Sequence, residues 1–328
     1  MLLAQYIFAI IAGFIVLVWG ADRFVYGAAG TARNIGVSTL VIGLTIVGFG
    51  TSAPEILVSV IAALDGNPGI AIGNALGSNI ANIGLVLGAT ALVSPLLVSS
   101  KILKREFPIM LFAMAVVLFL VYDLQLGWID GLILLSGIVA FTVWLIKISR
   151  SKDKDTTLLH EFESEIPHIP LKNALLWTAA GLALLLVSSQ VLVYGAVNIA
   201  KYFGVSDLVI GLTIIAIGTS LPELATSIMS AIKKEHDMAL GNIIGSNMFN
   251  LLAVLGIPAI ISSPIPLATE VITRDYMMML GLSIALFLFA YGFKGPGRIN
   301  RFEGSLLLLG YFGYMGWIYF SVSSQIST

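Results

Sequence analysis

Two matching stretches, GTSAPE at Gly50–Glu55 and GTSLPE at Gly218–Glu223, decide the fold of this chain. Each lies in the middle of a long apolar run. Proline removes a backbone hydrogen-bond donor and glycine loosens a helix, so both runs are predicted to break or kink there. A carboxylate inside a membrane costs about 2.5–3.5 kcal/mol or more. Two such carboxylates, Glu55 and Glu223, at matching positions therefore indicate a shared function.

The similarity between the two regions extends well beyond these motifs. When Gly36 is aligned with Gly204, Gly36–Ser59 and Gly204–Ser227 are identical at 16 of 24 positions. In the same alignment, without a gap, Gly73–Gly88 and Gly241–Gly256 are identical at 9 of 16 positions. Apolar composition alone does not produce matched Thr, Ser, Pro, Glu and Asn residues. The sequence therefore predicts an internal repeat, with its two copies centred on about 36–88 and 204–256.

The composition excludes a soluble protein. Of 328 residues, 58% are hydrophobic and 11% are charged, and the mean hydropathy is +0.99. A soluble domain carries about 25% charged residues. The net charge of −1 excludes a nucleic-acid partner, which requires a basic surface, and the absence of cysteine excludes disulfides and thiolate chemistry. Continuous apolar runs of about 20 residues indicate membrane-spanning helices rather than a β-barrel.

The predicted fold is an all-α, polytopic membrane protein with ten transmembrane helices. A first five-helix repeat at 1–148 and a second at 173–328 flank a polar linker at 149–172. Because five is odd, the second repeat enters the membrane from the opposite side, so the repeats are inverted, as in many secondary transporters. The ten spans are expected at residues 3–21, 38–64, 70–94, 107–122, 127–148, 173–198, 206–232, 238–262, 276–293 and 304–323.

The basic residues predict the orientation. With the loops numbered in order, 15 of the 17 Lys and Arg residues lie in the odd loops, and only Lys201 and Arg274 lie in the even ones. Basic residues mark cytoplasmic loops. We therefore expect an integral protein of the cell (inner) membrane, with a cytoplasmic linker and both termini outside.

Polar residues recur at helical spacing within four of these spans. Residues four apart share one face of a helix. No histidine or cysteine lies among them, and oxygens with two negative charges suit a hard cation such as Ca²⁺. The predicted helix breaks also free backbone carbonyls that are available to bind a cation. Gly48 and Ala216 are the candidate residues to offer such a carbonyl. The four sets are Thr51, Glu55 and Ser59; Thr219, Glu223 and Ser227; Asn74, Ser78 and Asn82; and Asn242, Ser246 and Asn250.

The repeated GTSxPE, followed in each half by GNxxGSNxxN at Gly73–Asn82 and Gly241–Asn250, resembles the α-repeats of the calcium/cation antiporter superfamily. Within it the chain most resembles prokaryotic sodium/calcium exchangers, particularly the YrbG-like bacterial members. The resemblance covers the whole chain. It implies that Ca²⁺ lies between the two glutamates and Na⁺ in neighbouring sites of hydroxyl and carbonyl oxygens. The side chains that it implies are Thr51, Ser52, Glu55, Ser78 and Asn82 with Thr219, Ser220, Glu223, Ser246 and Asn250.

One position departs from the resemblance. Well-known archaeal exchangers carry Asp at the position of Asn250, whereas both repeats of this chain carry Asn there. This difference leaves open the choice of ion, the stoichiometry and any coupling to protons.

The sequence thus predicts a Ca²⁺/Na⁺ antiporter without a cofactor and without enzymatic activity. Two alternatives remain: a Ca²⁺/H⁺ antiporter, in which protons replace Na⁺, and a cation channel. An intramembrane serine hydrolase is disfavoured because Ser52 and Ser220 have no basic partner within their spans. The oligomeric state is left open.

Overall fold

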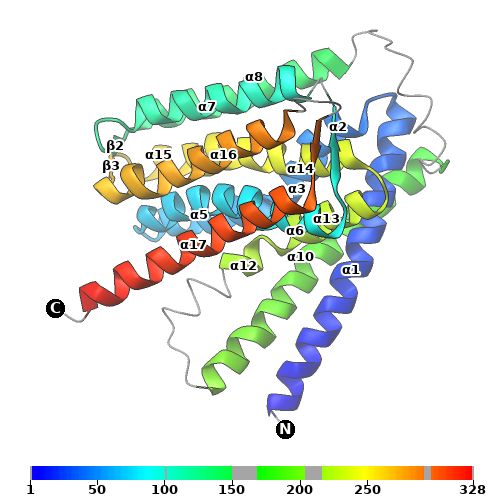
Figure 1. The fold of residues 1–328 in the computed structure, drawn as a ribbon, viewed down its shortest axis with the longest axis horizontal. Helices are drawn as coiled ribbons and strands as arrows, with labels where there is room; N and C mark the ends of the chain where they lie inside the picture. Colours follow the sequence, from blue (N-terminus) through cyan, green and yellow to red (C-terminus); the bar gives the residue numbers. More distant parts are fainter. Residues whose placement is uncertain (1, 100–101, 150–167, 204–215, 292–296, 327–328) are drawn as a thin grey trace.

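The computed structural model describes residues 2–99, 102–149, 168–203, 216–291 and 297–326, and nearly all of them are helical (Figure 1). The α-helices are α1 (Leu2–Ile35), α2 (Thr39–Ile42), α3 (Gly48–Thr51), α4 (Ala53–Leu64), α5 (Pro68–Ala81), α6 (Gly88–Val93), α7 (Phe107–Leu120), α8 (Trp128–Ser149), α10 (Leu171–Tyr202), α12 (Ala216–Thr219), α13 (Leu221–Ile232), α14 (His236–Phe249), α15 (Gly256–Ile261), α16 (Met277–Ala290) and α17 (Arg301–Ile326). Five π-helical segments adjoin them: η1 (Gly43–Val47), η2 (Asn82–Leu87), η3 (Ile102–Glu106), η5 (Asn250–Val254) and η6 (Val271–Tyr276).

Within the described residues, six helices are long and apolar enough to cross a membrane. The number is seven if the bent pair Thr39–Thr51 and Ala53–Leu64 forms one span. The protein is therefore a polytopic membrane protein. The predicted linker at 149–172 lies largely outside the described residues, and so does the beginning of the second copy of the sequence repeat, at 204–215.

The first predicted span, at 3–21, is too short. Helix α1 continues to Ile35, so Arg23 and Arg33 lie on a helix and not in a loop. The extension stays helical because one side of it is buried in the protein, at residues that include Phe24, Val25 and Ala28. The charge of Asp22 is balanced by Lys233, whose Nζ lies 2.7 Å from Asp22 Oδ1.

The centre of the bundle is formed by α5–α6 and α14–α15. In the most apolar 18-residue stretch of each, 78% and 89% of the residues are buried, respectively. Helices α1 and α10 lie side by side as a separate, inclined pair (Figure 1). Glycines permit their close approach, since a Cβ added at Gly27 would meet the backbone N of Thr178 at 2.4 Å. The remaining long helices surround the central pair.

Two short strand pairs accompany the helices of this otherwise helical fold. β1 (Leu96–Val98) pairs antiparallel with β4 (Gly297–Ile299), and β2 (Gln125–Leu126) pairs antiparallel with β3 (Ile265–Pro266). Each strand lies in a connection between helices. Strands of this length are too short to show an alternating pattern, so no feature of the sequence predicted them.

The strand pairs mark two ends of the molecule, which we call the β1–β4 end and the β2–β3 end. At the β1–β4 end, Ser94 Oγ donates to the Ala231 carbonyl at 3.3 Å. At the β2–β3 end, Ser262 Oγ donates to the Ala63 carbonyl at 2.8 Å. Each of these hydrogen bonds joins a residue of the first half of the chain to one of the second half.

Helix α14 crosses η1 and α3 at very short distance. A Cβ added at Gly245 would lie 2.7 Å from the Leu44 carbonyl oxygen, and one at Gly241 would lie 2.7 Å from the Leu40 carbonyl oxygen. Small residues at this spacing let helix backbones approach closely, as Gly241 and Gly245 do here. It brings the interrupted helix of the first half against the central helix of the second.

The substitution Gly245→Ala should destabilise the protein, because the added methyl group must push α14 away from Leu44. Overpacking of this kind costs about 1–3 kcal/mol. Gly281→Ala, in α16, is the matched control, since no described atom lies within 4 Å of its added Cβ. Thermal unfolding in detergent should show a lower midpoint for the first variant only; equal midpoints would contradict the close crossing.

Candidate functional site

Both motif prolines stand where a helix restarts. Ser52 separates α3 from α4 with φ −81° and ψ 3°, and Ser220 separates α12 from α13 with φ −87° and ψ 3°. The axes on the two sides of Ser52 differ by 43°. Pro54 and Pro222 lie in the first turn of the new helix, where no backbone donor is needed. The predicted break is therefore confirmed in both halves.

The two motif glutamates occupy the first turns of α4 and α13. Glu55 and Glu223 are each only 1% exposed, and their charges interact. The N-terminus of a helix carries a partial positive charge, which favours an anionic side chain in this turn. Burial of two carboxylates beside each other remains costly, so the pair requires further compensation.

Thr51 joins the two halves at this point. Its Oγ1 donates to Asn242 Oδ1 at 3.0 Å and lies 3.3 Å from Ser246 Oγ. Ser246 Oγ in turn donates to the Gly48 carbonyl at 3.4 Å. Residues from opposite halves of the sequence thus form one hydrogen-bonded group, and this group includes the predicted carbonyl of Gly48.

The carboxyl groups contact hydroxyls that the sequence predicted as their neighbours. Glu55 lies beside Ser78, and Glu223 lies beside Thr51 and Ser52. The Ser52 hydroxyl nevertheless has no hydrogen bond of ordinary geometry. Since Glu223 belongs to the second half and Thr51 to the first, the two motifs share one polar centre.

Two asparagines hold the motif helices in place. Asn74 Nδ2 donates to the Glu55 carbonyl and to Ser59 Oγ, both at 3.0 Å. Asn242 Nδ2 donates to the Glu223 carbonyl at 3.3 Å and to Ser227 Oγ at 2.9 Å. These bonds fix α5 to α4 and α14 to α13.

Asn82 and Asn250 each begin a π-helical segment, η2 and η5. Such segments are rare and often occur at functional sites. Asn82 Nδ2 donates to Asn247 Oδ1 at 3.1 Å, which orients the Asn82 amide from the other half. The sequence analysis did not include Asn247 or its equivalent Asn79 among the candidates. Their place inside the repeated GNxxGSNxxN was the available signal.

Several buried oxygens of this centre have no hydrogen-bond partner in the described structure. Each of these oxygens can accept a hydrogen bond or bind a cation, and a buried polar atom without a partner calls for an explanation. The unpartnered oxygens are Ser52 Oγ, Glu55 Oε2, Ser220 Oγ, Glu223 Oε2 and Asn250 Oδ1. Among the other predicted residues, Thr219 is half-buried at the end of α12 and Ala216 begins that helix. Oxygens of this kind are ligands for Na⁺ and Ca²⁺.

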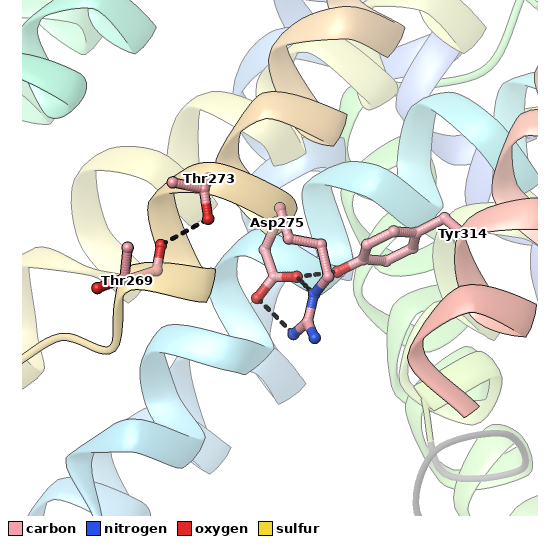
Figure 2. Close-up of polar contacts among 5 residues, drawn as sticks. Thr269, Thr273, Asp275 and Tyr314 are labelled. Atoms are coloured by element: carbon pink, nitrogen blue, oxygen red, sulfur yellow. Dashed lines mark hydrogen bonds and ion pairs between the residues drawn. The ribbon is translucent and has the colours of Figure 1, made fainter. Parts of the chain in front are cut away.

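Polar groups also meet away from this centre. Figure 2 shows Asp275 of η6 beside Tyr314 of α17. Tyr314 donates to Asp275 Oδ1 at 2.8 Å, and Arg274 Nε lies 2.6 Å from the same oxygen. Another buried carboxylate, Glu106, pairs with Arg105 at 2.6 Å. These groups are paired with basic residues, unlike the carboxylates of the motif helices.

The fold and this oxygen-lined centre define a polytopic membrane protein with a pair of acidic residues in its interior. Residues 5–147 and 173–320 match the family described as sodium/calcium exchanger protein. The chain therefore belongs to the sodium/calcium exchanger family, whose members are transporters. The resemblance stated from the two motifs is confirmed.

Individual relatives are similar over almost their full length. The chain is 49% identical over 306 residues to CaxA of Alkalimonas amylolytica, covering 93% of this chain and 96% of that protein. It is 41% identical over 313 residues to the inner membrane protein YrbG of Escherichia coli (strain K12), covering 94% and 95%. A structure of the sodium-calcium exchanger NCX_Mj, soaked with Na⁺ and Ca²⁺, matches with a TM-score of 0.80 at 34% identity, covering 95% and 97%.

Asn242→Leu should lower stability more than Asn74→Leu does. The first change removes the hydrogen bonds of Asn242 with Thr51, Ser227 and the Glu223 carbonyl, each of which contributes about 0.5–1.5 kcal/mol. Asn74 serves its own half only. Asn198→Leu is the control, because the Asn198 amide donates to the Tyr194 carbonyl of its own helix, α10. Unfolding midpoints should fall in the order control, Asn74→Leu, Asn242→Leu, and a reversal of the last two would refute the role of Asn242 between the halves.

Proposed function

We propose that this protein is a secondary active antiporter that exchanges Ca²⁺ for Na⁺ across the cell membrane by alternating access. The observation that carries the proposal is the buried pair Glu55 and Glu223. The Oε2 atom of each carboxylate has no hydrogen-bond partner among the described residues. Family membership supports the class of transporter. The structure match to an exchanger soaked with Na⁺ and Ca²⁺ supports these two ions.

The ligands that we assign to the ions are the predicted ones. Glu55 and Glu223 hold Ca²⁺ between the two halves. The neighbouring Na⁺ sites use Thr51, Ser52, Ser78 and Asn82 with Thr219, Ser220, Ser246 and Asn250, together with the backbone carbonyls of Gly48 and Ala216. Within the described residues no third acidic or histidine side chain joins the pair. A site with two carboxylates binds Ca²⁺ less tightly than one with more charges, which suits an ion that must be released.

Charge explains why the exchange is obligatory. One Ca²⁺ neutralises the two carboxylates, and two Na⁺ ions provide the same charge. An empty site would carry a charge of −2 through the dry interior, at a cost of several kcal/mol per ion. Only the loaded protein then switches sides. The pair α1 and α10, which lies apart from the central helices, is the element that we assign to the movement.

The proposed topology has ten spans in two inverted repeats, 1–148 and 173–328. The bounds of α4, α5 and α6 recur, in the alignment of Gly36 with Gly204, as those of α13, α14 and α15, which supports the repeat. The strand pair β1–β4 joins two odd loops and the strand pair β2–β3 joins two even loops, which supports the count of spans. We assign the β1–β4 end and the linker to the cytoplasm and both termini to the outside, because the odd loops carry most of the basic residues.

The carboxylates carry the transport in this proposal. Radioactive Ca²⁺ uptake into Na⁺-loaded proteoliposomes should therefore fall to the background level for Glu55→Gln and for Glu223→Gln, since either change halves the charge that balances Ca²⁺. Exposed Glu270→Gln is the matched control and should transport like the wild type. Wild-type rates in either buried variant would remove that glutamate from the site.

The Ca²⁺/H⁺ antiporter remains the main alternative, because protons could neutralise the same carboxylates. An outward Na⁺ gradient at equal pH on both sides should drive Ca²⁺ uptake if Na⁺ is the coupling ion. A pH gradient without Na⁺ should then drive none. The opposite pattern would establish proton coupling, and current through single open channels would favour the cation channel.

A further inference from the structure

Helix α13 carries two buried hydroxyls that the proposed ion site does not use. Thr226 and Ser230 have no exposed surface, and neither hydroxyl oxygen has a hydrogen-bond partner. A hydroxyl in a helix commonly donates to the carbonyl four residues earlier, as Thr90 does to Val86 at 2.7 Å. An unpaired buried polar group costs about 1–3 kcal/mol. Two of them one turn apart therefore require a reason.

The two hydroxyls lie further along α13 than Glu223 and on the same side of the helix. Thr226 and Ser230 follow Glu223 by three and seven residues, so all three lie on one side of α13. Ser227, on the edge of this side, is bonded to Asn242 of α14. Met229, on another side, packs against the apolar cluster of α1. The hydroxyl row thus leads from Glu223 along α13, which ends at Ile232 beside the β1–β4 end.

The equivalent helix of the first half, α4, has matching bounds in the repeat and carries Val58 and Ala62 at the equivalent positions. Val58 is 36% exposed there, whereas Thr226 has no exposed surface, so the second half encloses a position that the first half leaves open. The hydroxyls are a feature of the second half alone, and they lie on the side of the centre that faces the β1–β4 end.

We propose that Thr226 and Ser230 line the route by which a hydrated cation passes between the acidic centre and the β1–β4 end. The route is closed in this structure, since both residues are fully buried. When it opens, water and the passing ion become the missing partners of the two hydroxyls. The inference rests on the proposed function for the nature of the ion, but not for the existence of the route.

Cysteine accessibility tests the route directly, because the chain contains no cysteine. Thr226→Cys and Ser230→Cys would be treated with a membrane-impermeant, positively charged methanethiosulfonate from either side of oriented vesicles. Exposed Lys234→Cys marks the β1–β4 end, and exposed Gln125→Cys marks the β2–β3 end. Ser283→Cys is the matched buried control, because the Ser283 hydroxyl is bonded to the Met279 carbonyl within its helix.

We expect both cysteines to react from the side of Lys234→Cys in at least one of three conditions: Na⁺, Ca²⁺ or neither ion. Ser283→Cys should stay unreacted in all of them. Absence of reaction at both positions, or reaction only from the side of Gln125→Cys, would overturn the proposal. Labelling requires no transport, so reactive cysteines in a protein that exchanges no Ca²⁺ would refute the proposed function and leave the route standing.

A second pair of variants covers the case in which the cysteines disturb folding. Thr226→Val and Ser230→Ala introduce the residues that the first half already carries. The maximal exchange rate should fall at least threefold in the double variant, while the KM for Ca²⁺ on the Gln125 side stays unchanged, because the site itself is intact. An unchanged maximal rate would overturn the route.

Discussion

The structure depends on the burial of two carboxylates in one polar centre, with no basic partner among the described residues. Glu55 and Glu223 are almost completely buried, whereas Glu106 and Asp275 are paired with arginines. Such a pair is tolerable only if the surroundings supply positive potential. The helix breaks at Ser52 and Ser220 supply part of this positive potential, because each glutamate then lies at the N-terminal, positive end of a new helix.

The remaining features follow from the same requirement. The motif helices must be held in place around the breaks at Ser52 and Ser220. Asn74 and Asn242 fix each motif helix to its neighbour, and Thr51 connects the halves. The crossing at Gly241 and Gly245 brings the backbones close enough for these short side chains to meet.

Much of this arrangement was predictable from the sequence, because the same motifs occur in both halves of the chain. The breaks at the two prolines and the burial of the two glutamates were expected and are observed. The extent of α1 was not, because its continuation to Ile35 depends on burial against other helices rather than on its own composition. The strand pairs were also missed, since partners from opposite halves of the chain leave no local pattern.

Asn242 makes more side-chain hydrogen bonds than Asn74, the equivalent residue of the first half. One amide serves a hydroxyl of the first half and both a carbonyl and a hydroxyl of the second, whereas Asn74 serves only its own neighbours. Two copies of a duplicated gene begin under the same selection. Here the tolerance to random substitution must differ between the copies, and the second asparagine should drift more slowly than the first.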